Sequence, residues 1–348
     1  MCNIAGYAGT HPAAPILIEM LRRQEAFDGS ASCGITTVHN GRLYTRKVIG
    51  NIDTLINTTD ALFLPGTVGI AHTRPGGSPE EYNFAHPFVT QSGRISGITN
   101  GTTRHPDYTA SAQRATEYLE DRGYTFFGGT NLKKSGFPKL KNGNYVSCVE
   151  VRANLVEAYV NDGMEIPAAM ARVTSECYTD SVLGILSLDT PDRFYINRTS
   201  RPAYQLKLEH GVAVASCKFA FPDGEGEAAE RLPIFTPCII CRDGVTVSGI
   251  KMTGVEEVSN LTEQGLEEGY KRISALLRGK ESSPLTFDDL ELAVWNNMRD
   301  LFDGNHTLIQ DAMMVYEALF RLHSEGKLKM ITKMATPVKR RYYMWIEE

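Results

Sequence analysis

Short apolar runs of the kind that form β-strands recur along the first 250 residues, and helical segments divide them into blocks. Two runs are joined by His39-Asn40-Gly41-Arg42, and two more by Arg242-Asp243-Gly244. Asn-Gly and Asp-Gly accept positive φ and therefore favour hairpins between antiparallel strands. Alternating strand-rich and helix-rich blocks predict an α+β fold with two antiparallel sheets packed together and covered by helices. The expected strands are 3–9, 34–38, 43–47, 67–71, 95–99, 182–188, 193–197, 212–216, 237–242 and 245–250.

Three helices are expected in the same region, at residues 15–25, 111–122 and 148–161. A glycine follows each of the last two helices, as is common at helix C-termini. Between these two helices lies 128–145, which is rich in Gly, Lys and Asn and has no apolar periodicity. We interpret it as an inserted loop.

The composition changes near residue 256. A charged amphipathic helix at 261–278 and a linker at 279–284 lead into helices at 288–303 and 307–326, and strand-like pieces follow at 328–333 and 341–348. Two helices followed by a β-hairpin have the order of a winged helix. We therefore expect one domain over residues 1–258 and a helical linker with a small winged-helix-like module over residues 259–348.

The predicted C-terminal hairpin is basic and aromatic, which leaves two interpretations open. It could be a winged-helix face for DNA. The plainer interpretation, which we favour, is a helical cap with a solvated charged edge, or a dimer or partner-docking module. The residues concerned are Lys327, Lys329, Lys333, Lys339, Arg340 and Arg341, together with Tyr342, Tyr343 and Trp345.

Charge and cysteine content narrow the class of protein. A net charge of -5 and a pI near 6.0 argue against a chain built mainly to bind nucleic acid or anionic membrane. No apolar run is long enough to span a bilayer, and the N-terminus lacks the order of a secretory signal, so we expect a cytoplasmic protein. Seven scattered cysteines suit reduced thiols, and Cys238-Ile-Ile-Cys241 is expected in a buried strand rather than a metal or redox site. We expect no cofactor and no metal.

Cys2 is the main candidate for chemistry. Methionine aminopeptidase removes Met1 when the next side chain is small, and the mature chain would then begin with Cys2. Such a residue carries a thiol nucleophile together with a free α-amine, which has a pKa near 8 and can act as its base.

Three downstream segments extend this pattern. They are Gly69-Ile-Ala-His-Thr-Arg74 with Ala85-His86-Pro87, then Thr99-Asn100-Gly101, and then Ser187-Leu-Asp-Thr-Pro-Asp192 with Arg198, Pro202 and Ala215-Ser216. With Cys2, this ordered set resembles the glutaminase domain of class II glutamine amidotransferases, which are N-terminal-nucleophile hydrolases, and is similar to the amino-terminal half of glucosamine-6-phosphate synthase. The resemblance covers residues 2–250 and implies a four-layer αββα sandwich.

The resemblance implies a role for each matching residue. Cys2 would attack the carboxamide carbon of glutamine, and its α-amine would take the thiol proton and later pass it to ammonia. The Asn100 side chain and the Gly101 backbone N–H would stabilise the oxyanion. Arg74 would bind the α-carboxylate of the substrate with its two-pronged guanidinium. We expect His72 to be a packed histidine rather than an acid–base group, and His86 likewise.

The chain departs from the family in the segments around these residues. Cys2 is followed by Asn3 instead of the usual glycine. The family's Arg-Trp-Ala-Thr-His-Gly is replaced by Arg74-Pro75-Gly76-Gly77-Ser78, in which Gly76 and Gly77 could still offer backbone contacts to the substrate. Phe27-Asp28-Gly29 stands where the family has Tyr-Arg-Gly.

The most consequential departure is at Cys148, where the resemblance places the aspartate that pairs with the α-ammonium of glutamine. A thiol cannot balance an ammonium, and deleting one partner of a desolvated charge pair costs about 2–5 kcal/mol. Glu150 or Asp180 could provide a substitute carboxylate.

Two hypotheses follow. The first is a Cys2-dependent amidohydrolase that acts on glutamine or a related amide and passes ammonia to a separate synthase. The second is a catalytically degenerate glutaminase fold that senses a ligand or binds a partner or DNA. Retention of Cys2, Arg74, Asn100 and Gly101 favours the enzyme, whereas Cys148 favours a changed substrate or the scaffold. A homodimer is compatible with either hypothesis.

Overall fold

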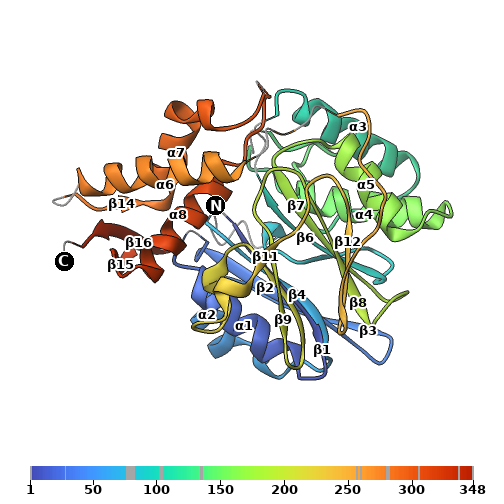
Figure 1. Cartoon of the computed structure of the whole chain (residues 1–348). Helices are drawn as coiled ribbons and strands as arrows, with labels where there is room; N and C mark the ends of the chain where they lie inside the picture. The colour runs from blue at the N-terminus through green and yellow to red at the C-terminus, as the bar shows by residue number, and fades with distance from the viewer. Residues whose placement is uncertain are drawn as a thin grey trace.

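The computed structural model describes residues 2–27, 29–75, 83–101, 105–133, 136–255, 258, 261–279, 283–304, 306–335 and 338–346. Two large antiparallel sheets form the centre of the molecule, and a third, smaller sheet belongs to the C-terminal segment (Figure 1). None of the helices in these residues has the length and apolar content needed to cross a membrane.

The first large sheet has the strand order β11-β9-β10-β1-β4-β2-β3. Its neighbouring strands are antiparallel, with β1 between β10 and β4. The bounds are β1 (Asn3–Gly9), β2 (Ser32–His39), β3 (Arg42–Ile49), β4 (Val68–Arg74), β9 (Tyr204–Leu208), β10 (Gly211–Ala215) and β11 (Glu230–Arg231).

The second large sheet has the order β13-β12-β8-β7-β6-β5. In it β6 pairs with β7 in antiparallel register, so that Asn100 lies opposite Val182. The bounds are β5 (Phe88–Val89), β6 (Ile95–Gly101), β7 (Ser181–Ser187), β8 (Arg193–Arg198), β12 (Cys238–Cys241) and β13 (Gly244–Val247).

The two sheets pack face to face because their strands alternate the sides to which their side chains point. On β1, Ile4 and Ala8 enter the core between the sheets, whereas Ala5 and Tyr7 pack on the opposite side. Gly6 also points between the sheets, where a Cβ atom would lie 2.4 Å from the Phe194 ring. Glycine at this position therefore lets the central strands of the two sheets approach closely.

Helices cover both outer faces and complete the expected four layers (Figure 1). The first sheet carries α1 (Ala13–Gln24) and α2 (Ile52–Thr58), and the second carries α3 (Tyr108–Asp121), α4 (Cys148–Asn161) and α5 (Ile166–Glu176). The predicted two-sheet arrangement is confirmed. The predicted bounds of the helix at 148–161 are also confirmed.

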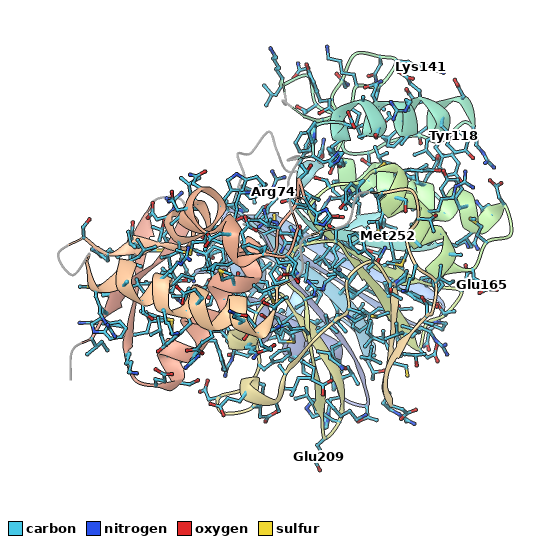
Figure 2. All side chains as sticks on the ribbon, turned by 45° about the horizontal axis from the view of Figure 1, so that its top comes forward. Arg74, Tyr118, Lys141, Glu165, Glu209 and Met252 are labelled. Atoms are coloured by element: carbon cyan, nitrogen blue, oxygen red, sulfur yellow. The ribbon has the colours of Figure 1, made fainter. Side chains whose placement is uncertain are left out.

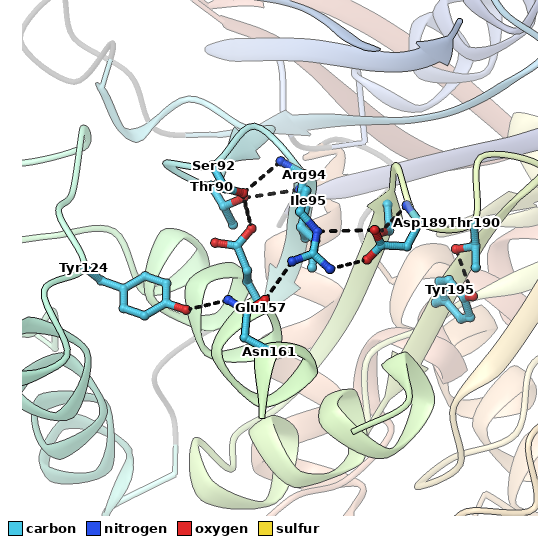
Figure 3. Close-up of polar contacts among 11 residues, drawn as sticks. Thr90, Ser92, Arg94, Ile95, Tyr124, Glu157, Asn161, Asp189, Thr190 and Tyr195 are labelled. Carbon is cyan, nitrogen blue, oxygen red and sulfur yellow. Dashed lines mark hydrogen bonds and ion pairs between the residues drawn. The ribbon is translucent and has the colours of Figure 1, made fainter. Parts of the chain in front are cut away.

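Polar contacts hold α4 in a fixed register on the second sheet (Figure 3). Glu157 is buried and accepts a 2.7 Å hydrogen bond from Thr90 Oγ1, just before β6. Arg94 forms two hydrogen bonds with Asp189 beyond the end of β7, at 3.2 and 2.6 Å. Arg94 Nη1 also donates a 2.7 Å hydrogen bond to Asn161 Oδ1 at the end of α4, so these contacts fix the C-terminal half of the helix on the second sheet.

Several elements were not expected from the sequence. They are α2, α5, β5, β9 and β11. The signal for α5 was present, because Ile166, Ala169, Met170 and Val173 have the spacing of one buried helix face. The helix expected at 288–303 was wrong in its length, since α7 (Phe287–Asn297) ends earlier and a 3-10 turn follows at Arg299–Leu301.

The C-terminal segment contains α6 (Glu263–Arg278), β14 (Leu285–Thr286), α7, α8 (Asp311–Ser324), β15 (Leu328–Ala335) and β16 (Val338–Trp345). Its three strands form a sheet of order β14-β16-β15. Its helices share a core that includes Ile273, Leu290 and Val315. The expected order of helices followed by a β-hairpin is present, but β14 and the 3-10 turn after α7 were not expected. The domain boundary at residue 258 and the winged-helix likeness stay predictions.

The predicted basic hairpin packs partly against the first sheet layer. Lys339 Nζ lies 2.6 Å from Glu25 Oε1 and 2.8 Å from Asp53 Oδ2. The Arg341 guanidinium lies 4.3 Å from the centre of the Phe27 ring. These two cations of the hairpin are therefore bound within the chain, which supports the interpretation as a cap over the interpretation as a DNA-binding face.

Candidate active site

One cavity of about 310 Å³ brings together the residues that the sequence singled out. It lies where β1 begins, where β4 and β6 end, and where α4 begins. Figure 2 shows Arg74 near the middle of the molecule, between the C-terminal helices and the helices of the second sheet. The cavity is lined by Cys2, Arg74, Pro75, His86, Thr99, Gly101, Tyr108, Phe137, Ser147, Cys148, Val149, Arg152 and Thr179.

Four of the seven predicted site residues, namely Cys2, Arg74, Gly101 and Cys148, line this cavity. Cys2 directly precedes β1, Arg74 and Gly101 end β4 and β6, and Cys148 begins α4, so residues separated by well over a hundred positions in the sequence meet here. Asn100 lies next to the cavity but does not line it. Gly76 and Gly77 lie outside the described residues.

Cys2 directly precedes β1, the central strand of the first sheet. Its side chain is partly buried. Burial raises the pKa of the Cys2 thiol above its ordinary value, and the positive charges of Arg74 and Arg201 partly oppose this. The thiol is therefore protonated at neutral pH, and nucleophilic attack would require a base to remove its proton.

Arg74 is the last residue of β4 and faces the cavity. Its Nη1 donates a 2.8 Å hydrogen bond to the carbonyl oxygen of Phe84, which fixes one side of the guanidinium. Burial lowers the pKa of Arg74, and a Cys2 thiolate would partly offset this. Arginine remains a cation at neutral pH despite such a shift, and it can bind a carboxylate.

Asn100 and Gly101 end β6. The Asn100 side chain is fully buried, and its Nδ2 donates a 3.4 Å hydrogen bond to Ser216 Oγ. Ser216 Oγ in turn accepts a 2.9 Å bond from the Ile4 backbone N–H, two residues beyond Cys2. At Gly101 a Cβ atom would lie 2.4 Å from the carbonyl oxygen of Asp180, so the close approach of β6 to β7 requires glycine.

The two histidines are packed, as expected. Their rings lie 4.0 Å apart, and His72 Nε2 donates to the carbonyl oxygen of Thr99 at 2.9 Å. Burial lowers the pKa of His72 to about 3 and lowers the pKa of His86 well below its ordinary value. Both are neutral at physiological pH. His72 therefore supports the β6 segment that carries Asn100 and Gly101.

Neither substitute carboxylate considered from the sequence lines the cavity. Glu150 accepts hydrogen bonds from the backbone N–H groups of Phe127 and Gly128, at 2.6 and 2.8 Å. Asp180 Oδ2 accepts bonds from Arg201 Nε and Nη2, at 2.9 and 2.7 Å. Both carboxylates therefore have structural partners away from the position that Cys148 occupies.

Sequence reasoning missed two polar residues of the cavity, Tyr108 and Arg152. Burial raises the pKa of the Cys148 thiol, and the neighbouring Tyr108 hydroxyl partly opposes this. Arg152 lies one helical turn after Cys148 on α4, and its side chain reaches the same cavity. The i, i+4 spacing on a correctly predicted helix was the signal that could have identified Arg152.

The described lining residues include two arginines and no aspartate or glutamate. Within the described ranges, no group of three or more His, Cys, Asp or Glu side chains is arranged to hold a metal ion. The arrangement offers a thiol, cationic groups and a strand-end backbone N–H around one small volume. Such a set can bind an anionic amide and attack its carbonyl carbon.

Several known proteins are similar to this chain in sequence. No profile of a protein family matches the chain. The glutamine--fructose-6-phosphate aminotransferase [isomerizing] of Caldanaerobacter subterraneus subsp. tengcongensis is 33% identical over 204 residues, which are 58% of this chain and 29% of the relative. The protein of the same name from Staphylococcus aureus strain Mu50 is 28% identical over 283 residues, which are 81% of this chain and 43% of the relative. The chain thus spans less than half the length of either relative.

Solved structures share the fold. The glutamine phosphoribosylpyrophosphate amidotransferase from B. subtilis complexed with ADP and GMP has a TM-score of 0.57 and 16% identity, and the match covers 79% of this chain and 58% of that chain. A structure described as the allosteric regulatory enzyme of purine biosynthesis has a TM-score of 0.56 and 16% identity, with the same coverage. At such low identity, these similarities indicate a shared fold only.

Proposed function

We propose that the chain is a class II glutamine amidotransferase-like amidohydrolase that uses Cys2 to hydrolyse a side-chain amide and release ammonia, as its sequence similarity to the glutamine--fructose-6-phosphate aminotransferases supports. The observation that carries the proposal is the shared cavity of Cys2, Arg74 and Gly101. These residues come from the start of β1, where Cys2 directly precedes the strand, and from the ends of β4 and β6. Neither the core nor the surface of the fold needs a thiol, a guanidinium and a strand-end N–H in one place.

In this proposal the Cys2 sulfur attacks the carboxamide carbon after the α-amine of Cys2 has taken the thiol proton. The new S–C bond forms as the carbonyl electrons move to oxygen, and collapse of the intermediate breaks the C–N bond. The ammonium of Cys2 returns a proton to the leaving nitrogen, which departs as ammonia. Water then hydrolyses the thioester and releases a carboxylate. A positioned base of this kind contributes roughly 10² to 10⁴ in rate.

Removal of Met1 is a necessary part of the proposal, because a peptide nitrogen on Cys2 cannot act as a base. The raised pKa of the Cys2 thiol increases this need, since little thiolate exists at neutral pH without a base. The location of Cys2 at the wall of a cavity supports access for substrate.

The Gly101 N–H and the Asn100 side-chain amide are the proposed oxyanion donors. Asn100 Nδ2 has two hydrogens, of which Ser216 Oγ accepts one at 3.4 Å. The second hydrogen is available for an oxyanion only if the side chain turns toward the Cys2 sulfur. Loss of one oxyanion donor typically costs about 3–4 kcal/mol in transition-state stabilisation.

The C-terminal segment is proposed to act as a cap that holds the start of β1, with the domain boundary at residue 258. Its contacts with Asn3, Glu25 and Phe27 support this role. The ammonia acceptor is proposed to be a separate synthase. We assign the C-terminal segment no role in using the ammonia.

The test is intact-mass analysis after incubation with two electrophiles, 6-diazo-5-oxonorleucine and 6-diazo-5-oxohexanoate, which lacks the amino group. The expected result is loss of Met1 and one adduct, located on Cys2 by peptide mapping. Cys2→Ala should take no adduct, and Cys241→Ser, a thiol change outside the cavity, should be labelled like the natural chain. Retained Met1, or a Cys2 that neither reagent labels, would contradict the proposal.

A further inference from the structure

We propose that the substrate is the monoamide of a small dicarboxylic acid that carries a hydrogen-bond acceptor, such as an α-oxo oxygen, where glutamine carries its α-ammonium. The inference rests on the proposed function and specifies the substrate class of the same site. Three observations support it: the charge of the cavity, the state of Arg152, and the size of the cavity.

The cavity is cationic at the position where glutamine would need a negative charge. Arg74 and Arg152 line it, and the described lining residues contain no carboxylate. Cys148 is a neutral thiol because burial raises its pKa. A substrate ammonium placed beside Cys148 would lose its hydration without gaining a counter-ion, and two guanidinium groups would repel it.

The second observation is that the Arg152 side chain has an unused hydrogen-bond donor within the described part of the chain. Its side chain is among the most deeply buried in the protein, with 1% of the residue exposed. Nη2 donates to the carbonyl oxygen of Cys177, and the guanidinium lies 5.4 Å from the centre of the Tyr108 ring. Nε is buried and has no hydrogen-bond partner among the described residues. Buried donors are rarely left unpaired, and the Arg152 residue lines the cavity, so its side chain is the proposed donor to an acceptor on a ligand there.

The position of Arg152 directs that acceptor to the α-carbon. Arg152 follows Cys148 by one turn on the same helix, so both side chains lie on the face of α4 that meets the cavity. By the resemblance, Cys148 marks the place of the α-substituent. Tyr108 lines the same cavity, and its hydroxyl adds a second polar group near Cys148. An oxo oxygen at the α-carbon could accept from these groups, whereas an ammonium could not.

The cavity volume of about 310 Å³ limits the size of the substrate. This value is at the lower end of the usual range for ligand pockets. It suits a five-carbon monoamide that extends from Arg74, which would bind the carboxylate, to Cys2, which would attack the amide.

The test compares kcat/KM for glutamine, glutaramate and 2-oxoglutaramate, the last corrected for its open-chain fraction, in the Met1-processed protein. We expect 2-oxoglutaramate to exceed glutamine by tens-fold to a thousandfold, with glutaramate between them. Cys148→Asp should lower this ratio at least tenfold, because it restores the missing carboxylate. Cys148→Ser is the neutral control and should keep the preference.

Arg152→Met tests the second step of the argument. It should reduce the ratio of kcat/KM for 2-oxoglutaramate to kcat/KM for glutaramate at least tenfold, and thermal unfolding would show whether the variant is folded. Glutamine as the best substrate of the natural chain, with Cys2-dependent turnover, would overturn the inference and leave the proposed function intact. No Cys2-dependent cleavage of any of the three amides would instead reject the proposed function.

Discussion

The Tyr316 hydroxyl donates a 2.9 Å hydrogen bond to Asn3 Oδ1, in a contact that is buried and joins residues 313 positions apart. Tyr316 lies on α8 of the C-terminal segment, and Asn3 is the residue after Cys2. Asn3 Nδ2 also donates to the carbonyl oxygen of Gln24, so the Asn3 side chain bridges α8 and α1. The C-terminal segment thus helps to fix the strand from which Cys2 projects.

Tyr316→Phe should therefore affect both stability and reactivity. The substitution keeps the ring that packs against Phe27 but removes the buried hydroxyl partner of Asn3. Leaving a buried acceptor unpaired costs about 1–3 kcal/mol of stability, and we expect Cys2 labelling to slow several-fold. Urea unfolding and labelling rates would measure this. Tyr270→Phe, which removes a hydroxyl bonded to Glu325 at the surface, is the matched control and should change either quantity little.

Arg74 should control the ionisation of Cys2. Burial raises the pKa of the Cys2 thiol, and the Arg74 cation opposes that shift. Arg74→Met should therefore raise the thiol pKa further and slow alkylation at pH 8. Alkylation rates across pH would report the midpoint for each protein. Arg46→Met, which removes a guanidinium paired with Asp60 at the surface, should leave the Cys2 midpoint unchanged. An unchanged midpoint in Arg74→Met would contradict the shared-cavity geometry.

Asp180 should behave as a structural residue rather than a substrate ligand. It forms a buried ion pair with Arg201 at 2.7 Å, with 1% and 4% of the two side chains exposed. Arg201 also pairs with Glu291 of α7 at 2.7 Å. Asp180→Asn should lower the free energy of unfolding by about 3–5 kcal/mol, because it breaks a buried charge pair.

Urea unfolding of Asp180→Asn should be compared with that of Asp189→Asn. Asp189 pairs with Arg94 where 37% and 39% of the two side chains are exposed, and its loss should cost less than about 1 kcal/mol. A variant of Asp180 that unfolds like the natural chain but has a raised KM would instead support a role in substrate binding.

The buried histidines should lower the free energy of unfolding as the pH falls into the moderately acidic range. The pKa of His72 is about 3 in the folded chain, whereas an unfolded histidine has a pKa near 6.5. The unfolded state therefore binds more protons between these values, and stability is lost as pH falls below about 6.5. Each such histidine contributes a slope of up to about 1.4 kcal/mol per pH unit in this window. His86, whose pKa is also lowered, adds to it.

Urea unfolding at pH 7, 6 and 5 would measure this slope. His72→Gln should reduce the slope by the contribution of one histidine, up to about 1.4 kcal/mol per pH unit. The substitution also alters the hydrogen bond to Thr99, so the absolute stability will change as well. His39→Gln, at an exposed position in the β2–β3 hairpin, should leave the slope unchanged. A natural chain whose stability is flat from pH 7 to pH 5 would contradict neutral burial of the pair.

Much of the fold was predictable because its signals are local. The Asn40-Gly41 turn predicted the β2–β3 hairpin, and short apolar runs marked the central strands. The order of motifs around Cys2, Arg74 and Asn100-Gly101 in the sequence indicated the resemblance to class II glutamine amidotransferases. The cap by α8 could not be predicted, because the Tyr316–Asn3 contact spans almost the whole chain and leaves no periodic trace in the sequence.

The features of the candidate site also fall into those that the sequence predicts and those that only the tertiary structure shows. The sequence alone determined which residues could carry chemistry, and it identified Cys148 as a thiol in place of a carboxylate, because residue type and order along the chain suffice for that. Only the tertiary structure decided that Glu150 and Asp180 are occupied elsewhere and that Arg152 faces the cavity. Charge balance in a buried site depends on which groups share a volume, and packing of the two sheets and their helices sets that volume.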